Sequence, residues 1–160
     1  MTDNLIYSDA TTLAELIRER GASSVEVVQA HLDRIEATDD KINAIVTVAD
    51  DALDAAKEAD EELAAGAETG PLHGVPFTVK DGFDTAGILT QRGSPIFAGR
   101  VPERDATAVA RWKQAGGIVL AKTNLPEFSY DVVSENLLSG RTATCRSRCV
   151  GRPPIPASRR

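Results

Sequence analysis

Lys80 is the residue of this 160-residue sequence whose type and position best fit chemistry. Val75, Phe77 and Val79 alternate with other residues ahead of it and Gly82 follows it, which predicts a short buried strand that ends in a loop. A lysine held at such a junction loses hydration, which favours the neutral amine and makes it available as a base. By spacing alone, however, Lys80 is better explained as an ordinary surface lysine at a strand end than as a base.

The other residue types that commonly do chemistry form weaker patterns. His31 and His73 are too far apart to indicate a metal site, and His73 is expected to make a structural hydrogen bond in its loop. Cys145 and Cys149 are spaced C-x3-C without a second pair, so a zinc site is not expected. Trp112 lies at helical spacing and is expected in the core.

Four blocks of the sequence form recognisable motifs. Residues 70–81 read Gly-Pro-Leu-His-Gly-Val-Pro-Phe-Thr-Val-Lys-Asp, and the other blocks are residues 101–107, 115–128 and 135–140. Over roughly residues 8–142 these blocks resemble the N-terminal part of the amidase signature family, in the family's own order. Several blocks in the right order are a far stronger signal than one short motif. The resemblance implies an α/β fold: the N-terminal portion, incomplete, of a mixed central sheet flanked by helices.

The resemblance also implies a function. Family members hydrolyse or transfer amide nitrogen with a Ser–cis-Ser–Lys triad, and Lys80 matches the lysine. Lys122-Thr-Asn124 and Glu127 fall in an element that borders the active site in the family, which implies a supporting role for Thr123, Asn124 and Glu127, although helix capping and loop hydrogen bonds would also account for them. We therefore expect hydrolysis of a small-molecule amide without a metal or organic cofactor. The A subunit of a glutamine-dependent amidotransferase is the alternative within the family.

The end of the sequence departs from the family pattern. Both triad serines are expected downstream, in Gly-Gly-Ser-Ser-Gly-Gly-like and Gly-x-Ser-x-Arg-like blocks, and neither block occurs here. We expect residues 1–142 to be the N-terminal part of an amidase domain and residues 143–160 to be an unstructured tail rich in arginine and proline. Such a chain would be truncated or frameshifted, and inactive alone. The alternative is a non-catalytic fragment that binds a partner or nucleic acid through its basic tail.

Charge changes near the same boundary. Residues 1–140 contain 12 Lys and Arg against 24 Asp and Glu, a net charge of −12, whereas the last twenty residues hold six arginines and no acid. Because the basic segment begins where the family pattern ends, an out-of-frame tail is the simpler explanation and a nucleic-acid partner is not expected. No apolar run approaches the ~18 residues of a membrane span, and no secretory signal is evident, so a cytoplasmic location is expected.

The elements that position these residues follow from periodicity and caps. Helices are expected over residues 11–20, capped by Thr11 or Thr12, and over 24–37, opened by the capping box Ser23-Ser-Val-Glu26. The further expected elements are a strand over 43–48, a helix over 50–65, the strand ending at Lys80, a helix capped by Asp105 and stopped by Gly116-Gly117, and a strand over 118–121.

The order of these elements predicts a topology. A right-handed crossover would place strands 76–80 and 117–121 parallel, with Lys80 at the edge of the sheet where active sites usually lie. The first two helices would pack outside as a hairpin, which in the family can contribute to a homodimer. Because the missing segment should supply neighbouring strands, we expect uncovered strand edges near Val79 and Val119.

Overall fold

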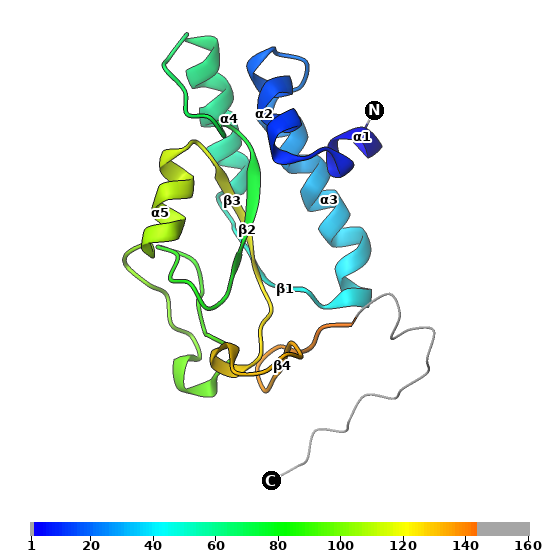
Figure 1. Ribbon diagram of the computed structural model, residues 1–160, viewed down its shortest axis with the longest axis vertical. Helices are drawn as coiled ribbons and strands as arrows, with labels where there is room; N and C mark the ends of the chain where they lie inside the picture. The colour runs from blue at the N-terminus through cyan, green and yellow to red at the C-terminus, as the bar shows by residue number, and fades with distance from the viewer. Residues whose placement is uncertain (1, 144–160) are drawn as a thin grey trace.

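The computed structural model describes residues 2–143 (Figure 1). Its helices are α1 Thr2–Tyr7, α2 Ala10–Arg18, α3 Ser24–Ile42, α4 Ala52–Ala64 and α5 Thr107–Gln114, with short 3-10 helices η1 Pro95–Phe97 and η2 Glu127–Ser129. Its strands are β1 Ile45–Val48, β2 Pro76–Lys80, β3 Ile118–Thr123, β4 Glu135–Asn136 and β5 Gly140–Arg141. Apart from Ala143, the predicted tail lies outside the described residues, as do both cysteines.

The first three strands form a mixed sheet in the order β1-β3-β2. β2 runs parallel to β3, as the sequence predicted, and β1 runs antiparallel to β3. Within the described residues, β3 is therefore paired on both edges and β2 on one only. The uncovered edge expected near Val79 is confirmed, whereas the one expected near Val119 is wrong, because β3 is the central strand. The side chains of both residues are buried.

Helices lie on both sides of this sheet (Figure 1). α3 packs against α4, and both contact the sheet, while α5 lies across β2 from α3. The main core cluster joins Val28 of α3 and Ala56 of α4 to Val109 of α5 and Leu120 of β3. The small alanine side chains on the inner face of α4 allow this helix to approach β3 closely. The alternation of helix and strand therefore gives the predicted α/β arrangement.

The N-terminal helices begin at side-chain caps. Ser23 Oγ accepts a hydrogen bond from Glu26 N, and Glu26 Oε2 accepts one from Ser23 N, which confirms the predicted capping box. The cap predicted at Thr11 or Thr12 is wrong. Asp9 takes that position, and its Oδ1 accepts a hydrogen bond of 2.8 Å from Thr12 N. Asp9, which lies shortly before the buried Leu13, was the stronger signal for the start of this helix.

The C-terminal end of α3 lies beyond its predicted position. The helix continues past residue 37 to Ile42, because no glycine or proline interrupts it, and Asn43 ends it in the left-handed conformation at φ 55°. Asp39 Oδ1 then accepts hydrogen bonds from Ala44 N and Ile45 N, which direct the chain into β1. These contacts orient the antiparallel strand next to β3.

α5 begins without a side-chain cap. Asp105, the predicted cap, instead accepts a hydrogen bond of 2.7 Å from Ala86 N and forms an ion pair of 2.9 Å with Lys113. Its carboxylate therefore ties the loop after β2 to the helix. Trp112 is 44% exposed, so its predicted place in the core is wrong. The indole stacks on Phe77 of the edge strand at 5.4 Å between ring centroids.

Candidate active site

Lys80 is the last residue of β2 and is exposed. In the register of the parallel pair it lies opposite Thr123, the last residue of β3. Both strands therefore end at the same edge of the sheet, as predicted. Lys80 makes no hydrogen bond or ion pair through its side chain within residues 2–143. The expected loss of hydration is wrong, because β2 is an edge strand and Lys80 points away from its packed face.

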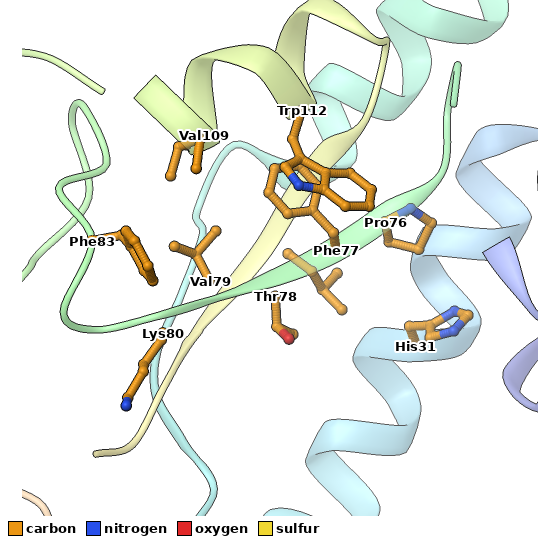
Figure 2. A pocket seen from close by; sticks show the side chains of 11 residues that line it. His31, Pro76, Phe77, Thr78, Val79, Lys80, Phe83, Val109 and Trp112 are labelled. Atoms are coloured by element: carbon orange, nitrogen blue, oxygen red, sulfur yellow. The ribbon is translucent and has the colours of Figure 1, made fainter. Parts of the chain in front are cut away.

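An open groove of about 650 Å³ runs along β2 (Figure 2). Phe77 and Val79 point from β2 toward Trp112 and Val109 of α5, and Phe83 closes one end. Lys80 points to the opposite side of the strand from Val79. The groove is therefore mostly apolar, with the amine of Lys80 at its border.

Asn124 is buried directly after β3 and holds the neighbouring loops together. Its Nδ2 donates hydrogen bonds to Gly140 O (3.2 Å) and Thr142 Oγ1 (3.0 Å). Its Oδ1 accepts hydrogen bonds from Asn136 Nδ2 (2.8 Å) and from Leu125 N (2.9 Å). These four partners belong to the loop after β3 or to the β4–β5 hairpin and the residue beyond it, and Nδ2 also lies 3.5 Å from Asn43 O before β1, so this geometry supports a positioning role.

Glu127 is exposed at the start of η2, where the sequence allowed a first helical turn. Its Oε1 accepts a hydrogen bond of 2.6 Å from Ser94 Oγ, and Ser94 is fully buried. The two residues that follow, Phe128 and Ser129, have positive φ of 50° and 63°. Side chains are rarely held in this conformation unless the surrounding structure requires it, and such strain often marks functional loops. Glu127 therefore belongs to a constrained loop beyond β3.

Lys122 belongs to the same element as Thr123 and Asn124, which the family resemblance places at the border of the active site. It is fully buried, and its Nζ donates hydrogen bonds to Phe83 O (2.6 Å), Thr85 Oγ1 (2.9 Å) and Thr90 Oγ1 (2.9 Å). Burial lowers the pKa of Lys122 to about 8, against the opposing attraction of nearby carboxylates. The predicted strand ended at residue 121. An extension to Thr123 would have placed Lys122 on the same face as the buried Leu120.

Two aspartates in the loop after β2 have pKa values that are shifted in opposite directions. Asp84 accepts hydrogen bonds from both terminal nitrogens of Arg100 (2.7 Å each) and one from Arg92 (3.1 Å), which lower its pKa to about 2. Asp81 is buried, and this burial raises the pKa of its carboxyl group, although the carboxylate accepts hydrogen bonds from Gln91 N. The hydrogen bonds to Asp81 and the arginine contacts of Asp84 both fix the loop that follows Lys80.

Each histidine has a ring nitrogen within hydrogen-bond distance of a backbone carbonyl oxygen. His73 is buried and its Nε2 lies 2.8 Å from Ala59 O, which confirms the predicted structural hydrogen bond. The Nδ1 of His31 lies 2.8 Å from Val27 O on its own helix.

Residues 2–143 contain no group of histidines, cysteines and acids arranged to hold a metal ion. None of the helices in this range has the length and apolar composition needed to cross a membrane.

Comparison with known proteins identifies the family. The sequence profile described as Amidase matches residues 26–149. This chain belongs to the amidase family. The matched segment includes β2 with Lys80, β3 and the loops after both strands. It extends past residue 142, where the resemblance to the family's motifs was expected to end.

Relatives of this amidase-family chain are much longer than the chain itself. It is 46% identical over 140 residues to the A subunit of glutamyl-tRNA(Gln) amidotransferase of Acidothermus cellulolyticus, covering 87% of this chain and 28% of the relative. It is 42% identical over 134 residues to indoleacetamide hydrolase of Bradyrhizobium diazoefficiens, covering 83% and 26%. The chain therefore spans little more than a quarter of each.

Solved structures share the same architecture. The native peptide amidase from Stenotrophomonas maltophilia matches with a TM-score of 0.79 at 33% identity, over 85% of this chain and 29% of that one. The fold described here is therefore an incomplete, N-terminal portion of the amidase fold.

Proposed function

We propose that the chain supplies the lysine base of an amidase that hydrolyses carbon–nitrogen bonds in small-molecule amides. The position of Lys80 carries this proposal: it is exposed, and its amine is unpaired within residues 2–143, where two parallel strands of an amidase-family sheet end. A general base needs an accessible lone pair near the reacting groups. Lys122, the other lysine at this edge, is fully buried and directs its protons at three acceptors, so it does not compete for the role.

In the proposed mechanism, the amine of Lys80 accepts a proton from a cis-serine, which accepts the proton of a nucleophilic serine. The serine oxygen attacks the amide carbonyl, backbone N–H groups stabilise the oxyanion, and the relay returns the proton to the leaving amine. Water then cleaves the acyl-serine ester. No family-like serine block occurs in the sequence. The proposal is therefore that residues 1–142 form the N-terminal part of the catalytic domain, and that the 160-residue chain, truncated or frameshifted, is inactive alone.

The A subunit of a glutamine-dependent amidotransferase is the second candidate, and the identity to the relative from Acidothermus cellulolyticus favours it. Both candidates break an amide bond by the same chemistry. They differ in the fate of the nitrogen, which a hydrolase releases as ammonia and an amidotransferase passes on to charged transfer RNA. Ammonia release from glutamine that requires partner subunits would support the second candidate.

The remaining partner and location proposals depend on separate measurements. A homodimer formed through the N-terminal helices would appear as a doubled mass in sedimentation, and a cytoplasmic location is checked by cell fractionation. Binding of RNA by the 160-residue chain that weakens with added salt would favour the non-catalytic alternative, because phosphate contacts release counterions.

The function is tested with a chimera and the chain side by side. Residues 1–142 replace the matching segment of the indoleacetamide hydrolase of Bradyrhizobium diazoefficiens, which is 42% identical over 134 residues. Ammonia release is measured with indoleacetamide, glutamine and an amidated peptide. We expect turnover of at least one amide by the folded chimera and none by the 160-residue chain. A folded chimera without turnover would contradict the proposal that this segment supplies a working base.

A further inference from the structure

The buried ammonium group of Lys122 has no carboxylate partner. Within the described residues its Nζ makes no ion pair, and its three hydrogen-bond acceptors are the carbonyl of Phe83 and the hydroxyl groups of Thr85 and Thr90. A buried lysine that served only to neutralise a buried acid would lie against that acid. All three acceptors instead belong to one segment, the loop that follows β2.

The protons of this network can be assigned. Thr85 Oγ1 donates to Phe83 O at 3.2 Å, and Thr90 Oγ1 donates to Ile88 O at 3.0 Å. Each threonine has therefore used its one proton on a carbonyl and can only accept from Lys122. Three acceptors require three donated protons, which is the complement of a full –NH3⁺ group. The geometry thus matches a charged lysine that binds the loop at three points.

This network reaches Lys80 through one turn. Phe83 N donates a hydrogen bond of 3.0 Å to Lys80 O, so the residue whose carbonyl Lys122 binds also closes the turn that begins at Lys80. Asp81 N donates a hydrogen bond of 2.9 Å to Thr123 O, the neighbour of Lys122 on β3. β3 therefore holds this turn at two points: Thr123 O accepts a hydrogen bond from Asp81 N, and Lys122 Nζ donates one to Phe83 O.

We propose that Lys122 is a positioning residue for Lys80, because its buried ammonium group clamps the turn that sets the direction of the Lys80 side chain. The proposal rests on the function proposed above, in which Lys80 is the base. It assigns Lys122 no contact with the substrate. A loosened turn would leave Lys80 present but misplaced, and a displacement of about 1 Å can reduce catalysis on the order of 100-fold.

The test compares variants of the 160-residue chain. Lys122→Met removes all three donors but keeps the length of the side chain. Thr90→Val removes one acceptor at nearly constant shape, so it decides the matter if Lys122→Met does not fold. Val27→Ala is the matched control, since Val27 is fully buried in the separate cluster of α2, α3 and Val75. It weakens the fold without contact to the turn.

Two readouts follow the turn directly and need no turnover. Hydrogen exchange is measured at the Asp81 and Phe83 amides, and the ¹⁵Nζ resonance of Lys80 is followed by NMR. We expect exchange at both amides to rise about tenfold or more in Lys122→Met, and severalfold in Thr90→Val, because a hydrogen bond from a charged donor is lost. The Lys80 resonance should move in both variants and stay in place in Val27→Ala.

The outcomes separate this proposal from the proposed function. If Val27→Ala accelerates exchange at the two amides as much as the other variants do, Lys122 contributes only stability and the positioning role is refuted. Unchanged exchange and an unchanged Lys80 resonance in Thr90→Val would also refute it. Absence of amide hydrolysis by the chimera would overturn the function of Lys80 but leave the clamp measurable.

Discussion

Ser94 and Glu127 are joined by a hydrogen bond of 2.6 Å between Oγ and Oε1, across 33 residues of sequence. Ser94 is fully buried and Glu127 is exposed, so the bond anchors the loop beyond β3 to the loop that follows β2. The two left-handed residues, Phe128 and Ser129, directly follow this anchor. The Ser94–Glu127 bond is therefore expected to hold a strained backbone in place.

Breaking the Ser94–Glu127 bond should destabilise the fold. Ser94→Ala is expected to lower the free energy of unfolding by about 1–2 kcal/mol, because it removes a charge-assisted bond and leaves a small void. Glu127→Gln, which keeps an acceptor, should cause a smaller loss. Urea denaturation of the single and double variants measures the coupling. Strictly additive effects would show that the bond contributes nothing.

Gly74, just before β2, is expected to tolerate no side chain. Its φ is +75°, and a Cβ there would overlap the hydroxyl group of Ser24. Gly66 has a similar φ of +73° but open space around it. Gly74→Ala should therefore lower the free energy of unfolding by roughly 3 kcal/mol, against about 1 kcal/mol for Gly66→Ala. Equal losses in thermal or urea unfolding would show that backbone strain alone matters at both positions.

Acid should weaken the contact between Asp84 and its arginines. Because the folded-state pKa of Asp84 is about 2, below its ordinary value, its stabilising effect is present above pH 4 and is lost as the pH falls toward 2. The free energy of unfolding should fall by roughly 1–2 kcal/mol more in the natural chain than in Asp84→Asn over this interval. Asp54→Asn, at an exposed pair with Lys57, is the control. Parallel curves for the natural chain and Asp84→Asn would contradict the prediction.

Lys122 should give a second pH dependence of stability, at alkaline pH. Burial lowers its folded-state pKa to about 8 from 10.5, so between these values the unfolded chain binds more protons than the folded chain. The free energy of unfolding of the natural chain should therefore rise relative to Lys122→Met as the pH increases from about 8 to 10. Urea denaturation at several pH values measures this difference. A relative decrease would mean that the three hydrogen bonds hold the amine charged throughout.

The fold was predictable wherever the signal was local. The capping box at Ser23 and Glu26 placed the start of α3, and the apolar run before Lys80 placed β2. The crossover rule then gave the parallel pairing with β3. These features depend on spacing along the chain, which the sequence shows directly.

The site was less predictable because it depends on strand order. Lys80 was expected to be partly dehydrated, but β2 has a partner on one edge only within residues 2–143, and this leaves Lys80 exposed. The same open edge leaves Trp112 only partly covered. The contacts of Lys122 were not predictable, because its three acceptors come from a loop 32 to 39 residues earlier in the chain. No local pattern shows such contacts.

The central claim is that Lys80 is the proton-accepting group of an amidase. The most direct measurement is the rate of ammonia release by the chimera carrying Lys80→Met, compared with the same chimera carrying Lys57→Met at an exposed lysine of α4. Methionine keeps the apolar stem and removes the amine. We predict that turnover falls by at least about 100-fold in Lys80→Met and stays within about twofold in Lys57→Met, with both proteins equally folded by circular dichroism. Turnover that survives Lys80→Met would contradict the account.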